Sequence, residues 1–207
     1  MLNLIEKYFP ELTEHQKSLL SALEKLYVDW NAKINIISRK DIMHFQERHL
    51  LHSLSIAKVI QFKQGTKILD VGTGGGLPGI PLSILFPDSS FVLIDSIGKK
   101  IKIVNAIIEE LKLPNVKAYQ SRVEEIDQPF DFVLGRAVTS LPVFSDWVKN
   151  KIKKSEINSI ANGILYLKGG DLNDELLDFK SPYDVYQIKD YFQEEYFETK
   201  KIIHVKF

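Results

Sequence analysis

The chain of 207 residues contains no cysteine, and its charges cancel, with 27 lysine and arginine residues against 27 aspartate and glutamate residues. The absence of thiols excludes disulfides, thiolate metal sites and mechanisms that use a cysteine nucleophile. A net charge of zero provides no global attraction for nucleic acid, and any such binding must depend on local clusters of basic residues. No apolar run is long enough to cross a bilayer, and the N-terminus lacks the basic start and apolar core of a secretory signal. We therefore expect a cytoplasmic protein with no membrane partner.

The first sixty or so residues carry a helical pattern with no strand signal. Thr13 and Gln16 match a capping box, and apolar residues then recur at helical spacing as far as Trp30. Asp41 can cap a second helix, whose apolar residues continue to Ile60. With 44% hydrophobic and 26% charged residues, the chain has the composition of a globular protein with one main domain and a small appendage. We expect residues 1–62 to form an N-terminal helical cap.

From Lys67 onward, short apolar runs alternate with helical segments, which is typical of a parallel sheet built from β-α-β units. Five strands are expected first, at Lys67–Val71, Phe91–Asp95, Val116–Tyr119, Asp131–Gly135 and Gly163–Leu167. Helices are expected near Pro81–Phe86, Lys99–Lys112, Pro142–Lys149 and Asn173–Phe179. The last two runs, Tyr183–Lys189 and Lys201–Phe207, alternate apolar and polar residues and predict a closing antiparallel pair. The pattern predicts a doubly wound, seven-stranded, Rossmann-like α/β domain over residues 63–207.

The first strand runs into a glycine-rich loop over residues 70–79, which reads DVGTGGGLPG. Glycine permits tight turns and close approach of a ligand to the backbone, and a loop of this kind between a strand and a helix is the usual place to hold a nucleotide. Asp95 ends the next strand, 19 positions after Gly76, near the spacing at which an acid binds ribose hydroxyls. Asp95 can also cap the helix that follows, and this is compatible with the ribose role. We expect Gly72, Gly74 and Asp95 to contact an adenosyl ligand.

Two ligands fit this arrangement, a nicotinamide dinucleotide and S-adenosylmethionine, because both present an adenosine to the same strand ends. The alternative without a ligand is a turn whose glycines are needed only for their positive φ. A dinucleotide needs backbone amides around its diphosphate, whereas Pro78 and Pro81 have no amide hydrogen. Asp70 beside the loop suits a ligand that carries an ammonium and a sulfonium. The loop therefore favours S-adenosylmethionine, with an NAD-dependent oxidoreductase as the alternative.

Several segments resemble the bacterial small-subunit ribosomal RNA methyltransferases of the G type, also called glucose-inhibited division protein B. They are Asn35–Ser38, Arg48–Leu54, Asp70–Leu82, Leu93–Ser96, Arg122–Glu125, Phe130–Val138 and Leu167–Gly169, and the resemblance covers nearly the whole chain. It implies a class I methyltransferase that transfers a methyl group from S-adenosylmethionine to nitrogen seven of one guanine in 16S ribosomal RNA.

The resemblance also implies site residues. The cofactor contacts of the family fall here on Gly72, Leu77, Val123, Glu124 and Arg136, with Val123 and Glu124 placed to meet the adenine. Two positions depart from the family pattern: Gly135 replaces a serine, and His52 replaces an aspartate. Because neither lies in the glycine loop, the departures concern the placement of the substrate rather than the binding of the cofactor.

The sequence contains no catalytic signature. Methylation of an exocyclic amine is typically accompanied by an Asn/Asp-Pro-Pro-aromatic tetrapeptide after the fourth strand, where this chain reads Gly135-Arg136-Ala137-Val138. Nitrogen seven of guanine offers a lone pair and loses no proton on methylation, and an enzyme that acts there needs no general base. We therefore assign no catalytic residue. A non-catalytic adenosyl-ligand sensor or ribosome assembly factor remains an alternative.

Basic residues near the expected mouth of the cleft are candidates for phosphate contacts, despite the zero net charge. They are Arg39, Arg48, Lys99 and Lys100. Arg136, at a strand end, can hold the cofactor carboxylate or a substrate phosphate. His49 and His52 have a spacing that could bind metal, but no third ligand accompanies them, and we expect no metal site. The expected partner is small-subunit ribosomal RNA within a ribosomal particle, and we expect the protein to be a monomer.

Overall fold

The computed structural model describes residues 2–34, 36–38 and 41–207 and has one seven-stranded sheet. The strands are β1 (Lys67–Val71), β2 (Ser90–Asp95), β3 (Val116–Gln120), β4 (Phe132–Arg136), β5 (Gly163–Gly169), β6 (Tyr183–Gln187) and β7 (Lys200–Lys206). Their order is β3-β2-β1-β4-β5-β7-β6. The first five are parallel, while β7 runs antiparallel to β5 and β6. The predicted sheet and its closing antiparallel pair are confirmed.

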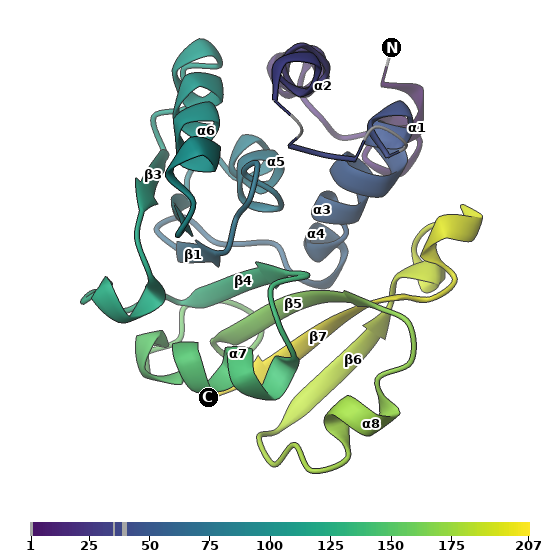
Figure 1. The fold of residues 1–207 in the computed structure, drawn as a ribbon. Helices are drawn as coiled ribbons and strands as arrows, with labels where there is room; N and C mark the ends of the chain where they lie inside the picture. The colour runs from purple at the N-terminus through teal and green to yellow at the C-terminus, as the bar shows by residue number, and fades with distance from the viewer. Residues whose placement is uncertain (1, 35, 39–40) are drawn as a thin grey trace.

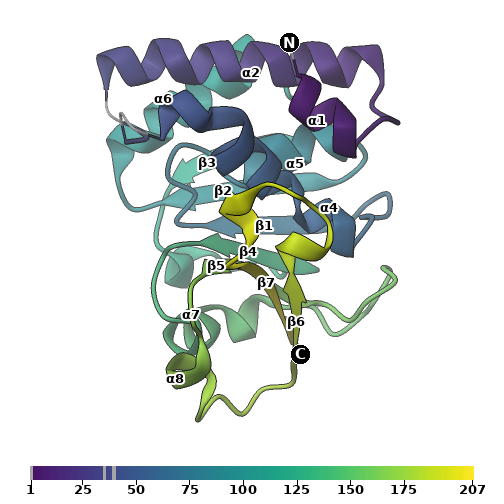
Figure 2. The same cartoon turned by 90° about the vertical axis from the view of Figure 1, so that its right-hand side faces the viewer.

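Helices cover both faces of the sheet, as Figure 1 shows. On one face lie α1 (Asn3–Tyr8), α2 (Glu14–Lys33), α3 (His52–Leu54), α4 (Ile56–Val59), α5 (Gly79–Leu85) and α6 (Gly98–Glu110). On the other face lie α7 (Leu141–Val148) and α8 (Asn173–Leu176). Figure 2 shows α2 extended across the top of the molecule, over α5 and α6. The doubly wound architecture is therefore as predicted.

Burial of apolar side chains joins the helical cap to the sheet. One core cluster combines residues of the cap, such as Leu20 and Leu54, with residues of the sheet such as Phe91 and Leu134. A second cluster packs Phe144 of α7 and its neighbours against the opposite sheet face. Because the cap and the sheet share one core, the boundary between residues 62 and 63 stays a prediction. Among the described residues, no helix is both long enough and apolar enough to cross a membrane.

The second helix of the cap differs from the prediction. Thr13 and Gln16 form the expected capping box at the start of α2, but the segment after Asp41 is broken into short pieces. These include a 3₁₀ turn (Ile42–His44) and a π-helical stretch (Gln46–Leu51) before α3 and α4. Ser53 donates its hydroxyl to the carbonyl of His49, a bond that bends helices. The side chain of Asp41 caps no backbone amide; it accepts from Ser38 and Arg48 instead. The later helix expected at Asn173–Phe179 is also shorter and ends at Leu176.

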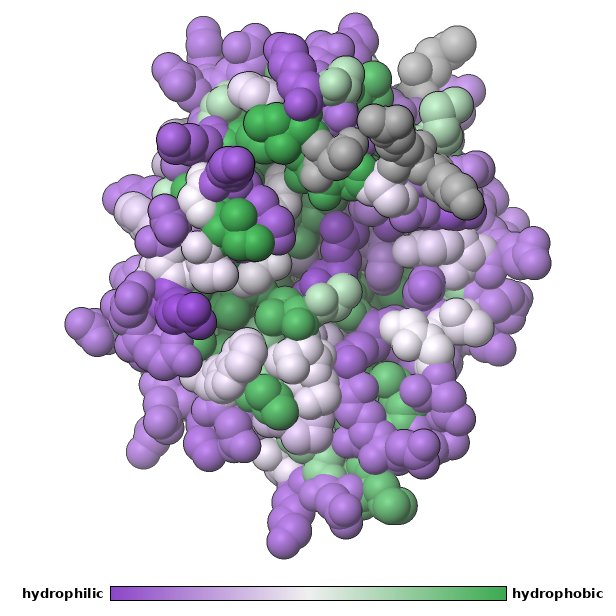
Figure 3. All heavy atoms as spheres, in the orientation of Figure 1, coloured by the Kyte–Doolittle hydropathy of each residue, from purple (hydrophilic) through white to green (hydrophobic). Residues whose placement is uncertain are grey.

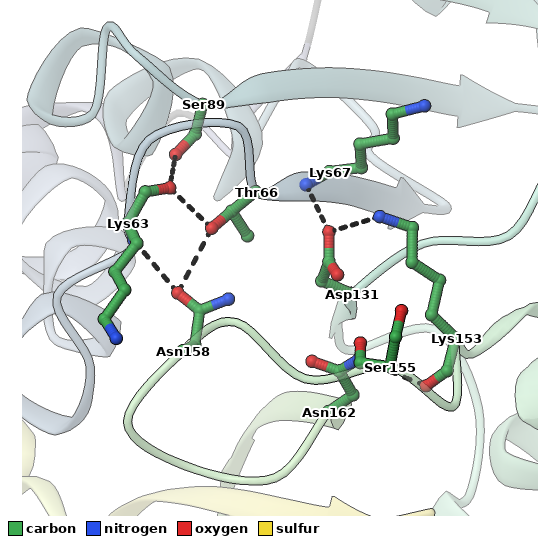
Figure 4. A network of polar contacts seen from close by, with 9 residues as sticks. All are labelled: Lys63, Thr66, Lys67, Ser89, Asp131, Lys153, Ser155, Asn158 and Asn162. Atoms are coloured by element: carbon green, nitrogen blue, oxygen red, sulfur yellow. Dashed lines mark hydrogen bonds and ion pairs between the residues drawn. The ribbon is translucent and has the colours of Figure 1, made fainter.

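The amino ends of the strands are fastened by a polar network, drawn in Figure 4. Asp131, which is 1% exposed, accepts from the Lys67 amide at 2.7 Å and from the Lys153 ammonium at 2.8 Å. Asn158 accepts from the Lys63 amide at 2.9 Å and from the Thr66 hydroxyl at 3.1 Å. The connection over residues 149–162 is thus bonded to the start of the sheet.

Candidate active site

The glycine loop owes its shape to backbone conformation. Gly72, Gly74 and Gly76 have φ of 66°, 61° and 96°, in the left-handed region that side chains disfavour. A Cβ on Gly72 would also lie 2.9 Å from the side chain of Val138, in the loop after β4. Most amides of the loop already donate hydrogen bonds, either to loop carbonyls or to Ile94, Asp95 and Asp70; these amides belong to Thr73, Gly74, Gly76, Leu77 and Gly79. Few amides therefore remain for a diphosphate, which agrees with the preference against a dinucleotide.

Asp70, at the end of β1, lies beneath the loop rather than beside a ligand. Its Oδ2 accepts from the Thr73 hydroxyl at 2.6 Å and from the Gly79 amide at 2.9 Å, and the side chain ties both ends of the loop together. Burial raises its pKa to about 6, although these two hydrogen bonds oppose the shift. Its Oδ1 is buried and has no hydrogen-bond partner among the described residues. The acid predicted to attract a cationic ligand thus first holds the loop in place.

Asp95, at the end of β2, joins the loop to the next helix. Its Oδ2 accepts from the Gly74 amide at 2.9 Å, and its Oδ1 accepts from the Ile97 amide at 2.9 Å. The ammonium of Lys100 lies 3.5 Å from Oδ2. A carboxylate oxygen has two lone pairs, and the Oδ1 of Asp95 can still accept a hydroxyl. The helix-start role and the ribose role remain compatible, as expected from the sequence.

A cavity of about 200 Å³ opens at the carboxyl ends of β1, β2 and β3, and we call it the β2–β3 cavity. It is lined by Val71, Gly72, Ile94, Asp95, Ser96, Ser121, Arg122, Val123, Glu124, Val138 and Trp147. Four of the predicted cofactor contacts, Gly72, Asp95, Val123 and Glu124, therefore lie around one space. The Val123 amide has no hydrogen-bond partner within the described part of the chain, which leaves it free to donate to an adenine nitrogen. Trp147, 42% exposed, was not predicted from the sequence.

A second cavity of about 480 Å³ lies at the ends of β4 and β5, and we call it the β4–β5 cavity. Its lining residues are Arg48, His49, His52, Arg136, Ala137, Leu167, Lys168, Gly169, Tyr196 and Lys200. Arg136, predicted as a cofactor contact, and Arg48, predicted as an RNA contact, thus share this cavity. Arg136 pairs with neither Asp131 nor Glu124, and it makes no ion pair with any residue that the structure describes.

The two cavities meet at one loop. Arg136 and Ala137, at the end of β4, line the β4–β5 cavity, while the next residue, Val138, lines the β2–β3 cavity. The face of the molecule drawn in Figure 3 is hydrophilic around most of its rim, and hydrophobic residues gather toward its middle. A ligand in one cavity would therefore be a close neighbour of a ligand in the other.

The remaining predicted residues lie elsewhere. Leu77 is 3% exposed and packs in the core, lining neither cavity, and its contact with the cofactor stays a prediction. Lys99 and Lys100 lie near the start of α6, where Lys99 is exposed and Lys100 faces Asp95. Arg39 lies outside the described residues. In the described ranges, no group of acidic or histidine residues could hold a metal ion.

Packing accounts for both departures from the family pattern. A Cβ on Gly135 would lie 2.5 Å from the ring of Tyr166 and 2.7 Å from the ring of Phe144, and a side chain has no room there. His52 packs edge-on against Tyr196, with ring centroids 5.7 Å apart, and against Phe197 at 6.2 Å. The histidine therefore joins the cap to the connection between β6 and β7.

The β2–β3 cavity fits the adenosyl part of S-adenosylmethionine by its donor and acceptor groups. The free Val123 amide can donate to the adenine ring, the exposed Glu124 carboxylate can accept from the adenine amine, and Asp95 can accept from ribose hydroxyls. The guanidinium of Arg136 can pair with the carboxylate at the methionine end. The contacts of these four residues with the cofactor stay predictions.

Comparison with known proteins gives concordant results. The family model described as rRNA small subunit methyltransferase G matches residues 16–203. Proteins named ribosomal RNA small subunit methyltransferase G are similar over nearly the whole length: that of Christiangramia forsetii is 54% identical over 99% of this chain and 96% of its own, and that of Flavobacterium psychrophilum is 56% identical over 97% and 96%.

Solved structures agree on the fold. A SAM dependent methyltransferase from Aquifex aeolicus matches with a TM-score of 0.58 and 16% identity, over 83% of this chain and 100% of that one. A precorrin-6y C5,15-methyltransferase from Geobacter metallireducens matches with a TM-score of 0.55 and 14% identity, over 82% and 90%. The class I methyltransferase fold predicted from the sequence is confirmed.

Proposed function

This chain belongs to the rRNA small subunit methyltransferase G family, and from that premise we propose that it methylates nitrogen seven of a guanine in 16S ribosomal RNA. The methyl donor is S-adenosylmethionine. Of the three classes that the sequence left open, the family match supports the methyltransferase over the oxidoreductase and the non-catalytic binder. We further propose that the protein acts as a monomer in the cytoplasm, on RNA within a ribosomal particle.

The observation that carries the proposal is the adjacency of two unlike cavities along one loop. The β2–β3 cavity presents an amide and carboxylates, which suit an adenosyl group, and the β4–β5 cavity presents cations, which suit a polyanion. Since Arg136 and Val138 open into different cavities only two residues apart, the donor and the acceptor can be held side by side.

Bound S-adenosylmethionine supplies an electrophilic methyl group. The protein has to align an acceptor with that methyl group and exclude competing geometries. Nitrogen seven of guanine attacks with its own lone pair, and the reaction therefore requires no general base. Alignment, rather than proton transfer, is the task of the site residues.

The experiment is a comparison of small-subunit RNA from cells with and without this protein, by mass mapping of nuclease fragments. A single guanine that loses 7-methylation in the deletion strain, and regains it when the gene is restored, supports the proposal. Unchanged RNA, or methylation at another atom, contradicts it.

The particle requirement is tested with purified protein. With zero net charge, the protein should methylate intact small subunits faster than deproteinised RNA, because it lacks the general attraction that supports non-specific binding. Equal or better activity on short naked RNA would contradict that part of the proposal.

A further inference from the structure

The β4–β5 cavity gathers positive charge in a chain whose net charge is zero. Four permanently charged side chains line it, Arg48, Arg136, Lys168 and Lys200, and none of its described lining residues is acidic. Arg48 is paired with Asp41 at 2.8 Å, and Lys168 with Glu175 at 2.9 Å. Arg136 and Lys200 have no ion-pair partner in the described part of the chain. The positive charges of Arg136 and Lys200 therefore repel one another unless an anion binds beside them.

Two histidines that line the cavity add unused hydrogen-bonding groups. His52 is 6% exposed, and its Nε2 has no partner among the described residues; both ring nitrogens of His49 are likewise buried and unpartnered. Burial lowers the pKa of His49 to about 4 and lowers the pKa of His52 as well. Both rings are therefore neutral at pH 7. A buried polar atom without a partner is costly, and these atoms point to a ligand that the cavity is built to receive.

Tyr196 organises the cations. Its ring lies 4.6 Å from the Lys200 ammonium and 5.6 Å from the Arg48 guanidinium, both within the range of cation–π attraction. The ring thereby draws a residue of the cap and a residue of β7 to one place. Without Tyr196, both long side chains would regain rotamer freedom that the site has to remove again on binding.

The segment that carries Tyr196 is itself anchored. Glu194, two residues earlier, accepts from the Tyr8 hydroxyl at 2.9 Å and pairs with the Lys7 ammonium at 3.0 Å. The Gln193 amide donates to the Tyr8 hydroxyl at 2.9 Å. The connection between β6 and β7 is thus fixed to α1, and this keeps Tyr196 at the mouth of the cavity.

We propose that the β4–β5 cavity binds backbone phosphate of the acceptor RNA, with Arg48 and Lys200 as the contacting cations and Tyr196 as the residue that positions them. The inference rests on the proposed function, which supplies the RNA. The cofactor carboxylate is a single negative charge that Arg136 alone can match, and it leaves Lys200 without an anion. A phosphodiester chain brings a charge with every nucleotide, and a further negative charge can therefore reach Lys200 and Arg48.

The test measures binding of the protein, saturated with S-adenosylhomocysteine, to small ribosomal subunits from cells that lack the methyltransferase. Lys200→Gln should lower the slope of log affinity against log salt by about 0.7 to 0.9, as expected for the loss of one phosphate contact. Lys201→Gln is the matched control, because it removes the same charge from the next residue of β7, whose ammonium bonds the Gly170 carbonyl outside the cavity. Lys201→Gln should leave the slope near that of the wild type.

Tyr196 is tested with a pair of variants. Tyr196→Phe keeps the ring and should bind subunits as the wild type does, whereas Tyr196→Leu should weaken binding about threefold to tenfold, in line with the loss of two cation–π contacts. Both should retain the wild-type affinity for S-adenosylhomocysteine. Equal loss in both variants would show that the hydroxyl, and not the ring, matters, and would overturn the positioning role.

Two further results would overturn the phosphate site. One is an unchanged salt slope in Lys200→Gln; the other is a loss of S-adenosylhomocysteine affinity in that variant, which would make the cavity a cofactor site. Competition by inorganic phosphate at millimolar concentration would show an isolated anion site rather than an RNA site. Failure of the proposed function is a separate outcome, since it would appear as wild-type protein that does not methylate the subunits at all.

Discussion

Buried charged side chains differ in their partners between the two ends of the sheet. At the amino ends, Asp131 shares one oxygen between the Lys67 amide and the Lys153 ammonium, and Asn158 bonds the loop before β1 (Figure 4). At the carboxyl ends, one oxygen of Asp70 is buried without a partner, and Arg136 has no ion pair among the described residues. Among the described residues, the buried charge at the amino ends is paired, although the Nδ2 of Asn158 and the Oδ1 of Asn162 there have no partner, whereas at the carboxyl ends a charged group, Arg136, is itself left without an ion pair.

This difference separates stability from function within one sheet. A buried polar group that has all its hydrogen-bond partners stabilises the folded chain, and it has no missing contact for a ligand to supply. A buried group without a partner costs free energy in the free protein, and the cost is recovered only when a ligand supplies the missing contact. We therefore expect substitutions at the amino ends to lower stability and substitutions at the carboxyl ends to lower binding or turnover.

The largest expected effect is on stability, at Asp131. Asp131→Ala strands the Lys153 ammonium and the Lys67 amide, and it should lower the free energy of unfolding by about 3 to 5 kcal/mol. The rate per folded molecule should stay unchanged. Denaturant unfolding and an active-fraction titration check both values, with the exposed Asp127→Ala as a control that shifts stability by less than about 0.5 kcal/mol.

The next largest effect is on turnover, at Arg136. Arg136→Ala should lower kcat/KM about 100-fold, or roughly 3 kcal/mol, because it removes the cation between the two cavities. The melting temperature should hold steady or rise slightly, since the remaining cations repel one another less. A melting temperature several degrees lower, with a normal rate per folded molecule, would instead place Arg136 among the structural residues.

A pH dependence follows from Asp70. Its pKa is raised to about 6 by burial, and the folded protein therefore binds this proton more tightly than the unfolded chain. The stability that protonated Asp70 contributes is complete below about pH 4 and is lost as the pH rises through 6. Between pH 4 and pH 7, the free energy of unfolding of Asp70→Asn should rise by roughly 2 to 3 kcal/mol relative to that of the wild type.

That difference is measured by urea unfolding of both proteins across the pH range. Taking the difference removes the contributions of His49 and His52, which both proteins share. If the two free energies of unfolding differed by a constant amount from pH 4 to pH 7, the pKa of Asp70 would not be raised.

A smaller effect concerns the wall of the β2–β3 cavity. Trp147 lines it and is half exposed, and a flat adenine beside the indole would gain about 1 kcal/mol of stacking. Trp147→Ala should therefore weaken S-adenosylhomocysteine binding roughly threefold to tenfold. In Trp30→Phe, Trp147 is the only indole left, and its fluorescence should change on titration with the ligand. An unchanged spectrum with normal affinity would remove Trp147 from the site.

The fold could be predicted almost entirely from periodicity. The alternation of apolar runs with helical segments gave all seven strands to within one or two residues, because strands buried on both faces read as short apolar runs. The exception was the segment after Asp41. Its apolar spacing is helical, but the serines at 53 and 55 bond to backbone carbonyls, and the π-helical turn has no signature in residue type.

The site was predicted only where residues lie close in sequence to a strand end. Gly72 and Asp95 follow from the loop and its spacing, and Val123 and Glu124 required the family resemblance. Tyr196 and Lys200 reach the β4–β5 cavity from the far end of the chain, through a connection that packs on α1. No local pattern marks such residues, because the cap residues that they meet there, Arg48 and His52, are more than a hundred positions away in the sequence.

The central claim, that the carboxyl ends of the strands bind the cofactor while the amino ends only hold the fold, is tested most directly by calorimetry. S-adenosylhomocysteine is titrated into Asp95→Asn and Asp131→Asn, two isosteric changes at opposite ends of the sheet, both below their melting temperatures. Asp95→Asn should weaken binding at least tenfold, because a charged acceptor is lost, and Asp131→Asn should bind as the wild type does. Wild-type affinity in Asp95→Asn together with weakened affinity in Asp131→Asn would contradict the claim.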